Sequence, residues 1–374
     1  MQVAWSLDGA ETFVLEAIRS FATDRACPTP PADERWLDVA SRAGVLSVVL
    51  DAVGRAGHPL PANASRSRYF GVTTQLRARA ELAALIRALG PTTVRWVVLK
   101  GPILADIVYR RPAVRTYTDL DVLVHPHDLG EALDALEGAG FELVDRNWEL
   151  VARSGRGEIN LTIPNGGLLD LHWHVVNDGR ARSQFSVDVR SMVSRRVTVD
   201  IDGLSVPTLD PVDTIVHLAL HASLSGGHRA LWLLDLQQAV LHGGCTVEEL
   251  RERAQEMRTD LVVQVMLARA ARYVDQRLEE WASDIRTRVS WTRLCEMVSG
   301  SAPPLGVRPG KHTGRLVFSA TRATTGSSAA AVIRSAGQRG ILMLRKPVTR
   351  ETLHASDGTP ADRALWIAGA RLSE

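Results

Sequence analysis

The stretch VVLKGPILADIVYRRPAVRTYTDLDVLV, residues 97–124, decides the fold because its apolar residues change periodicity along it. Together with the residues just before it, its beginning forms VRWVVLK (94–100), an apolar and β-branched run typical of a buried strand. Apolar residues then follow helical spacing in GPILADIVYRR (101–111), and DLDVLV (119–124) has the pattern of another short strand. The sequence therefore predicts a strand, a turn at Gly101, a helix and a second strand.

Downstream of this stretch, apolar runs separated by Gly and Asn continue the predicted sheet, which covers residues 94 to about 208. HDLGEALDALEGAG (127–140) is predicted as a helix that ends at Gly140. The segments predicted as successive strands are FELVD (141–145), WELVARS (148–154), EINLTI (158–163) and LLDLHWHV (168–175).

Helical periodicity dominates on both sides of this sheet, in residues 35–57 and 74–90 and again after Pro207. The later helices begin with Asp210 as a predicted N-cap. A Pro- and Gly-rich loop, residues 300–313, interrupts them. We expect an α+β fold with a small mixed β-sheet core flanked by helical regions. Its predicted parts are an N-terminal helical region (1–90), the core (91–208), a helical bundle (209–299) and a C-terminal helical appendage (300–374).

Charge and composition limit the classes of partner. Lys and Arg number 44 against 42 Asp and Glu, a formal net charge of +2. Because dedicated nucleic-acid binders are strongly basic, we do not expect nucleic acid as a partner. The chain lacks a basic start followed by an apolar run, and no stretch reaches the roughly 18 apolar residues of a membrane span. We expect a cytoplasmic protein without a membrane segment.

Two carboxylates in DLDVLV form the first candidate site. Asp119 and Asp121 are two residues apart on a predicted strand, so their side chains point to the same face. Asp170 lies on another apolar strand, where a buried carboxylate is costly unless it meets a metal or a partner. Such acids suit Mg²⁺, with Mn²⁺ as the alternative, and Glu149 or Glu158 could replace Asp170 as the third acid.

The turn at Lys100 and Gly101 is the second part of the candidate site. A glycine there lets the backbone approach phosphate, and the beginning of the following helix favours an anion. Lys100 can add a positive charge. His172 shares a strand face with Asp170 and is a further candidate to contact the site.

Taken together, these segments resemble the uncharacterised nucleotidyltransferase family of the polymerase-β-like superfamily. The resemblance rests on the Leu-Lys-Gly turn, an Arg shortly before Asp-x-Asp, and the Leu-Asp-Leu-His-Trp strand. It extends through LDPVDTIVHLALHAS (209–223) and ALWLLDLQQAV (230–240), and so covers roughly residues 95 to 245. This chain departs from the wider superfamily in having Pro102 after Gly101 and a longer stretch between Gly101 and Asp119.

The resemblance implies roles for individual residues. Lys100 and Gly101 would contact the triphosphate, with Arg115 near phosphate. The residues implied as metal ligands and catalytic carboxylates are Asp119, Asp121 and Asp170, and Asp170 would orient the acceptor hydroxyl. Whether His217, His221 and Asp235 line the active site stays open. We do not expect a zinc protease from the histidine pair, because Leu218 occupies the position of the required glutamate.

The resulting hypothesis is a magnesium-dependent nucleotidyltransferase. It would move a nucleoside monophosphate from a nucleoside triphosphate such as ATP to a hydroxyl or phosphate of a small-molecule, peptide or protein acceptor, and release pyrophosphate. One alternative is a glycosyltransferase that binds its metal through Asp-x-Asp, although the strand, turn and helix before the acids argue against it. The other is a non-catalytic nucleotide-binding module, for example a toxin–antitoxin partner. The sequence leaves the nucleotide, the acceptor and the oligomeric state open.

Overall fold

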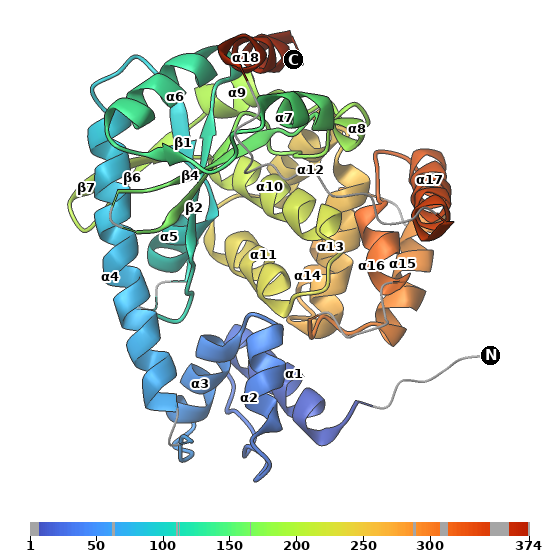
Figure 1. Ribbon diagram of the computed structural model, residues 1–374. Helices are drawn as coiled ribbons and strands as arrows, with labels where there is room; N and C mark the ends of the chain where they lie inside the picture. Colours follow the sequence, from blue (N-terminus) through green and yellow to red (C-terminus); the bar gives the residue numbers. More distant parts are fainter. Residues whose placement is uncertain are drawn as a thin grey trace. The chain divides into compact units, whose positions relative to one another are not determined.

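The computed structural model describes residues 7–61, 64–109, 111, 113–164, 166–286, 289–306, 313–344 and 359–372 (Figure 1). The chain divides into two compact units. We call them the helical unit (Met1–Val72, Arg111–Arg115 and Ile215–Gly340) and the sheet unit (Thr73–Arg110, Thr116–Thr214 and Ile341–Glu374). The prediction of an α+β fold with a mixed sheet and flanking helices is confirmed. The division into four regions stays a prediction.

The sheet unit contains a seven-stranded sheet with the order β3-β4-β5-β2-β1-β7-β6. The strands are β1 (Trp96–Val98), β2 (Asp119–Val124), β3 (Glu142–Leu143), β4 (Glu158–Thr162), β5 (Leu168–His172), β6 (Val197–Ile201) and β7 (Leu204–Thr208). β2 pairs with β5, and β1 with β7, in parallel; the other neighbours are antiparallel. The sheet is therefore mixed, as the sequence predicted.

One face of the central strands forms the core of the sheet unit. Residues that alternate along β2, β4 and β5 are buried in it: Leu120, Val122, Val124, Ile159, Leu161, Leu169 and Leu171. Residues on α4, α6, α7 and α18 complete this core. Because side chains alternate along a strand, the polar residues between these positions, which include Asp121 and Asp170, point to the opposite face.

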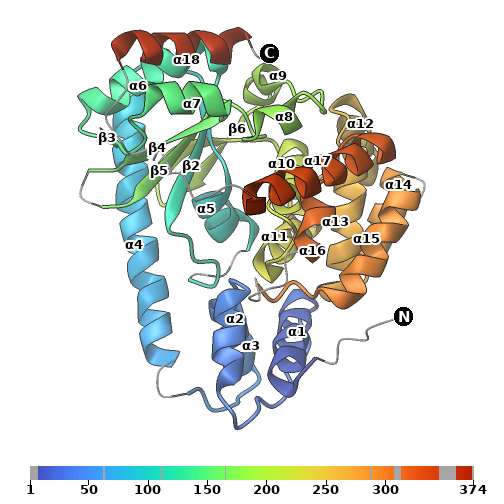
Figure 2. The ribbon, with the colours of Figure 1, turned by 45° about the vertical axis from the view of Figure 1, so that its right-hand side comes forward.

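Helices cover the apolar face of the sheet. Those that contribute to its core are α4 (Ala64–Leu89), α6 (Leu129–Gly138), α7 (Trp148–Ser154) and α18 (Pro360–Leu372). Figures 1 and 2 show α18 lying against α6 and α7. Arg363 on α18 pairs with Asp134 and Glu137 on α6, and Trp366 lies 5.7 Å from Trp148 between ring centroids. The C-terminal helix is thus part of the sheet unit.

The prediction of a strand at residues 148–154 is wrong, because WELVARS forms helix α7. Asn147 caps this helix by accepting a hydrogen bond from the amide of Leu150 at 3.0 Å, and Gly155 ends it in a left-handed conformation with φ of 63°. Trp148 and Val151 are buried at helical spacing. The cap and this buried face explain why the segment is helical.

Short helices connect the strands of the sheet unit. They are α5 (Lys100–Pro102), the π-helix η1 (Ile103–Val108), the 3-10 helix η2 (Pro126–Asp128), α8 (Gly179–Arg182) and α9 (Val189–Ser194). The predicted helix after the turn at Gly101 therefore exists, but most of it is a π-helix.

The helical unit packs around α13, whose side chains are mostly buried. Its helices are α1 (Gly9–Ala22), α2 (Arg35–Arg42), α3 (Leu46–Arg55), α11 (Ala230–His242), α12 (Val247–Glu256), α13 (Asp260–Tyr273), α14 (Leu278–Ile285), α15 (Ser290–Ser301) and α16 (Thr313–Ser319), with most of α10 (Pro211–Leu224) and α17 (Thr325–Leu344). Asp210 accepts a hydrogen bond from the amide of Asp213 at 2.8 Å, which confirms the predicted N-cap of α10. Within the described residues, no helix has the length and apolar character needed to cross a membrane.

Candidate metal and nucleotide site

The candidate site is built on the parallel pair β2 and β5. In this register Asp121 is the partner of Asp170, and Leu123 is the partner of His172. Both acids and the histidine occupy the sheet face opposite the apolar core. Residues about 50 positions apart in sequence thus meet because the strands pair without an offset.

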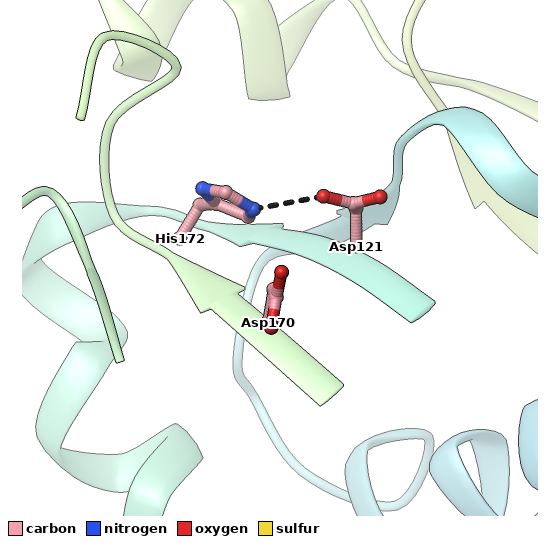
Figure 3. Close-up of side chains that lie close together, drawn as sticks. All are labelled: Asp121, Asp170 and His172. Carbon is pink, nitrogen blue, oxygen red and sulfur yellow. Dashed lines mark hydrogen bonds and ion pairs between the residues drawn. The ribbon is translucent and has the colours of Figure 1, made fainter. Parts of the chain in front are cut away.

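Three of the predicted residues come together closely. Ligand atoms of Asp121, Asp170 and His172 all lie within 4.8 Å of one another (Figure 3). Asp119 begins β2 on the same face but is not part of this group among the described residues. The charge of Asp119 nevertheless contributes to the raised pKa of Asp170. The structure therefore brings together two of the three predicted acids, with Asp119 as a neighbour.

Lys100 lies at the junction of β1 and α5 and contacts Asp121. Its Nζ is 2.9 Å from Oδ1 of Asp121, and both side chains are largely buried. Gly101, the next residue, has φ of 42° and ψ of −113°, which side-chain-bearing residues rarely adopt. A Cβ atom at Gly101 would lie 3.6 Å from the backbone oxygen of Asp119. The predicted glycine turn therefore passes close to the start of β2.

His172 connects Asp121 to a second carboxylate. Its Nε2 is 3.1 Å from Oδ1 of Asp121, and its Nδ1 is 3.4 Å from Oε2 of Glu158. Arg156 donates to Glu158 at 2.7 Å. Glu158, weighed from the sequence as a third acid, therefore orients the histidine in this structure, as a carboxylate commonly does for a metal-bound imidazole.

Sequence reasoning missed two polar residues beside the acids. Asn160 on β4 donates a short hydrogen bond from Nδ2 to Oδ1 of Asp170. Arg156 reaches Glu158 from the turn before β4. The alternation in EINLTI could have pointed to Asn160, because it places Glu158 and Asn160 on the same face of the strand. In the structure Asn160 is the register partner of Asp170.

Burial and charge shift the pKa values of the two acids in opposite directions. Burial acts to raise the pKa of Asp121, but the charge of Lys100 and the hydrogen bond from His172 outweigh it and hold that pKa well below its usual range. Burial and the negative charge of Asp121 raise the pKa of Asp170 to about 6. Burial acts to lower the pKa of His172, yet its contact with Asp121 raises it.

The donor set fits a divalent cation. Carboxylate oxygens are the preferred protein ligands of Mg²⁺ and Mn²⁺, and a neutral imidazole can join them. Burial first, and then the negative charges of Asp121 and Glu158, raise the pKa of Asp170, and a bound cation would offset both effects. Asp121, Asp170 and His172 are the residues that could hold the ion.

The remaining predicted residues belong to the helical unit. Arg115 forms a buried, two-pronged ion pair with Asp235, with distances of 2.8 Å from Nε to Oδ1 and 2.9 Å from Nη2 to Oδ2. His217 and His221 lie on α10 with ring centroids 6.3 Å apart. Their proposed contacts with the site stay predictions.

Comparison with known proteins gives the family. No curated protein matches the chain. A crystal structure of an antigenic nucleotidyltransferase-like protein from Paracoccidioides brasiliensis is similar at 19% identity and a TM-score of 0.35, over 56% of this chain and 93% of that one. The family model described as uncharacterised nucleotidyltransferase matches residues 30–275 of the 374, more than half of the chain. The chain therefore belongs to this family of uncharacterised nucleotidyltransferases.

Proposed function

We propose that the protein transfers a nucleoside monophosphate from a nucleoside triphosphate to a hydroxyl or phosphate group of a small-molecule, peptide or protein acceptor, with release of pyrophosphate. The observation that carries this proposal is the group of Asp121, Asp170 and His172, whose ligand atoms lie within 4.8 Å of one another. Membership of a nucleotidyltransferase family supports the same reaction class.

Asp121 and Asp170, joined by Asp119, are proposed to hold magnesium or manganese. When bound, such ions would stabilise the negative charge that develops in an in-line displacement at the α-phosphate. His172 would keep Asp121 oriented, because it contacts Asp121 on one side and Glu158 on the other. Asn160 fixes Asp170 in the same way through its hydrogen bond.

Residues beside the acids would bind the triphosphate, and Asp170 would help to position the acceptor. The backbone at Gly101 and the ammonium of Lys100 would contact phosphate oxygens. Asp170 would orient the acceptor hydroxyl beside the bound ion, which would activate that hydroxyl for attack. Arg115 would also contact phosphate, and its ion pair with Asp235 through Nε and Nη2 would hold the guanidinium in place.

The test is incubation with each labelled nucleoside triphosphate and Mg²⁺ or Mn²⁺, with pyrophosphate release and transfer of label as readouts. We expect wild type to release pyrophosphate. Asp121→Asn and Asp170→Asn should each lower the rate at least about a hundredfold. Glu142→Gln, an exposed carboxylate of β3 on the same sheet, is the matched control and should keep the wild-type rate.

The outcomes separate the proposal from its rivals. Equal rates in wild type and both acid variants would overturn the proposed site. Metal-dependent hydrolysis of a sugar nucleotide without pyrophosphate release would favour the glycosyltransferase alternative. Nucleotide binding that never leads to turnover would favour the non-catalytic module.

A further inference from the structure

A lysine ammonium lies at the carboxylate that is proposed to bind the metal. Lys100 Nζ is 2.9 Å from Oδ1 of Asp121, with side-chain exposures of 14% and 6% for the lysine and the aspartate. The same oxygen is 3.1 Å from Nε2 of His172. Oδ1 of Asp121 thus has two nitrogen neighbours, Nζ of Lys100 and Nε2 of His172.

The positive charge of Lys100 stabilises the buried, ionised carboxylate of Asp121. An ionised carboxylate as buried as Asp121 is costly without a positive partner, and Lys100 supplies that charge. A divalent cation bound by Asp121 and Asp170 would lie within a few ångströms of the same ammonium. Two positive charges at that separation repel strongly in a largely buried site, so lysine and metal compete for Asp121.

The ammonium of Lys100 also has a second potential partner, a phosphate at the Gly101 turn. Lys100 immediately precedes Gly101, whose unusual backbone conformation forms the turn proposed to contact the triphosphate. A lysine side chain is long and flexible, and its ammonium binds phosphate as a point charge. The position of Lys100 therefore allows the ammonium to serve either Asp121 or a phosphate.

We propose that Lys100 takes the place of the cation at Asp121 while metal is absent, and transfers to the triphosphate when the metal binds. This inference rests on the proposed function, because it takes Asp121 as a metal ligand. It follows that metal alone binds weakly, since it must displace the lysine. Nucleotide tightens metal binding because it gives the displaced ammonium a new partner.

The experiment measures the dissociation constant of Mn²⁺ for the full chain without nucleotide, by electron paramagnetic resonance of the free ion. Lys100→Met removes the competing charge and should tighten Mn²⁺ binding by about tenfold or more. Arg95→Met is the matched control, because Arg95 forms an ion pair with Asp128 in the same sheet unit. It should leave the Mn²⁺ affinity unchanged.

A second arm adds a non-hydrolysable nucleoside triphosphate. Nucleotide should tighten Mn²⁺ binding more in wild type than in Lys100→Met. Lys100→Gln, which is neutral but can still donate to Asp121, serves where the methionine variant does not fold. An unchanged or weaker Mn²⁺ affinity in the folded neutral variant would overturn the exchange.

Asp121→Asn separates this inference from the proposed function. If Asp121→Asn loses Mn²⁺ and the lysine variants gain none, the metal site stands and the exchange fails. If Asp121→Asn binds Mn²⁺ as wild type does, the metal site fails and the exchange fails with it.

Discussion

Asp121 and Asp170 are partners across β2 and β5, yet their surroundings act on them in opposite ways. Lys100 and His172 stabilise the ionised form of Asp121 against its burial. Asp170 accepts a hydrogen bond from Asn160, but burial and the charges of Asp121 and Glu158 disfavour its ionised form. Two neighbouring carboxylates therefore differ: the ionised form of Asp121 is stabilised and that of Asp170 is disfavoured.

Replacing these two acids should change stability in opposite directions. The pKa of Asp170 is about 6 in the folded protein, which is above its value in the unfolded chain. The free energy of unfolding therefore decreases as pH rises from the unfolded pKa to the folded pKa, and the whole decrease is reached above about pH 6. Asp170→Asn removes this cost and should raise the free energy of unfolding by about 1–2 kcal/mol at pH 7.5. Asp121→Asn should lower it, because Lys100 and His172 lose their partner.

Urea unfolding in the presence of a chelator measures both effects. The gain from Asp170→Asn should shrink towards pH 4, where the carboxyl is protonated in the folded protein. A variant less stable than wild type at pH 7.5 would contradict the electrostatic account of Asp170.

The sequence predicted the acids better than it predicted their contacts. Asp-x-Asp spacing and the apolar setting of Asp170 were sufficient to select these residues, since both depend on neighbours within a strand. The positions of Lys100 on Asp121 and of Asn160 on Asp170 were not predicted. Contacts across strands depend on register, which periodicity along one segment does not specify.

At the scale of elements, the strands whose own sequence is apolar and β-branched were predicted well. The strands at β1, β2, β4 and β5 follow apolar, β-branched sequence and were found as predicted. The β6–β7 hairpin was included only as part of the sheet region, although Asp202 and Gly203 at its turn, both with positive φ, are a common hairpin signal. The prediction for WELVARS was wrong because its seven residues fit both the strand pattern and the helix pattern. The N-cap at Asn147 favours the helix.

One close approach between elements gives a second prediction. Gly167, just before β5, lies against the buried carboxylate of Glu81 on α4: an added Cβ would be 2.4 Å from Oε1 and 2.6 Å from Cδ. Gly167→Ala should therefore lower the free energy of unfolding by about 1 kcal/mol, because the Glu81 carboxylate must move from its place beside Arg77. Urea unfolding measures this change.

A second substitution in the same contact tests the cause. Glu81→Ala removes the carboxylate that the new methyl group would meet, so Gly167→Ala should be better tolerated in the Glu81→Ala background than in wild type. An equal penalty in both backgrounds would point to the backbone at residue 167 instead of the contact.

At the scale of the whole molecule, the helical unit joins segments that are far apart in sequence. It combines Met1–Val72 with Ile215–Gly340 and the short piece Arg111–Arg115. The ion pair of Arg115 with Asp235 links that short piece to α11 inside the unit. Periodicity predicts each helix but not which distant helices pack together, so this grouping could not be predicted from the sequence.

One buried and one half-buried histidine should make stability depend on pH. Burial and the charge of Arg182 lower the pKa of His174 to about 3, and burial and the charge of Arg315 lower that of His228 to about 4. Both stay neutral in the folded protein at pH 5, whereas unfolded histidine binds a proton below about 6.5. Their contribution to stability is therefore complete above about pH 6.5 and decreases as pH falls towards 4.

The measurement is the free energy of unfolding at pH 7.5 and pH 5 for each unit's transition. His174→Gln should show a smaller loss between these pH values than wild type, and the exposed His127→Gln is the control. His172 acts in the opposite direction because its pKa is raised. The same loss in wild type and His174→Gln would contradict this origin of the pH dependence.

The register of β5 against β2 decides whether Asp170 reaches the candidate metal site. If β5 slipped by one residue against β2, Asp170 would turn into the apolar core and Leu171 would take its place on the outer face. A misaligned chain would then keep Asp121 at the site but lose Asp170 and His172 from it. If the proposed cation binds, it would stabilise the aligned sheet and leave each shifted alternative without that added stability.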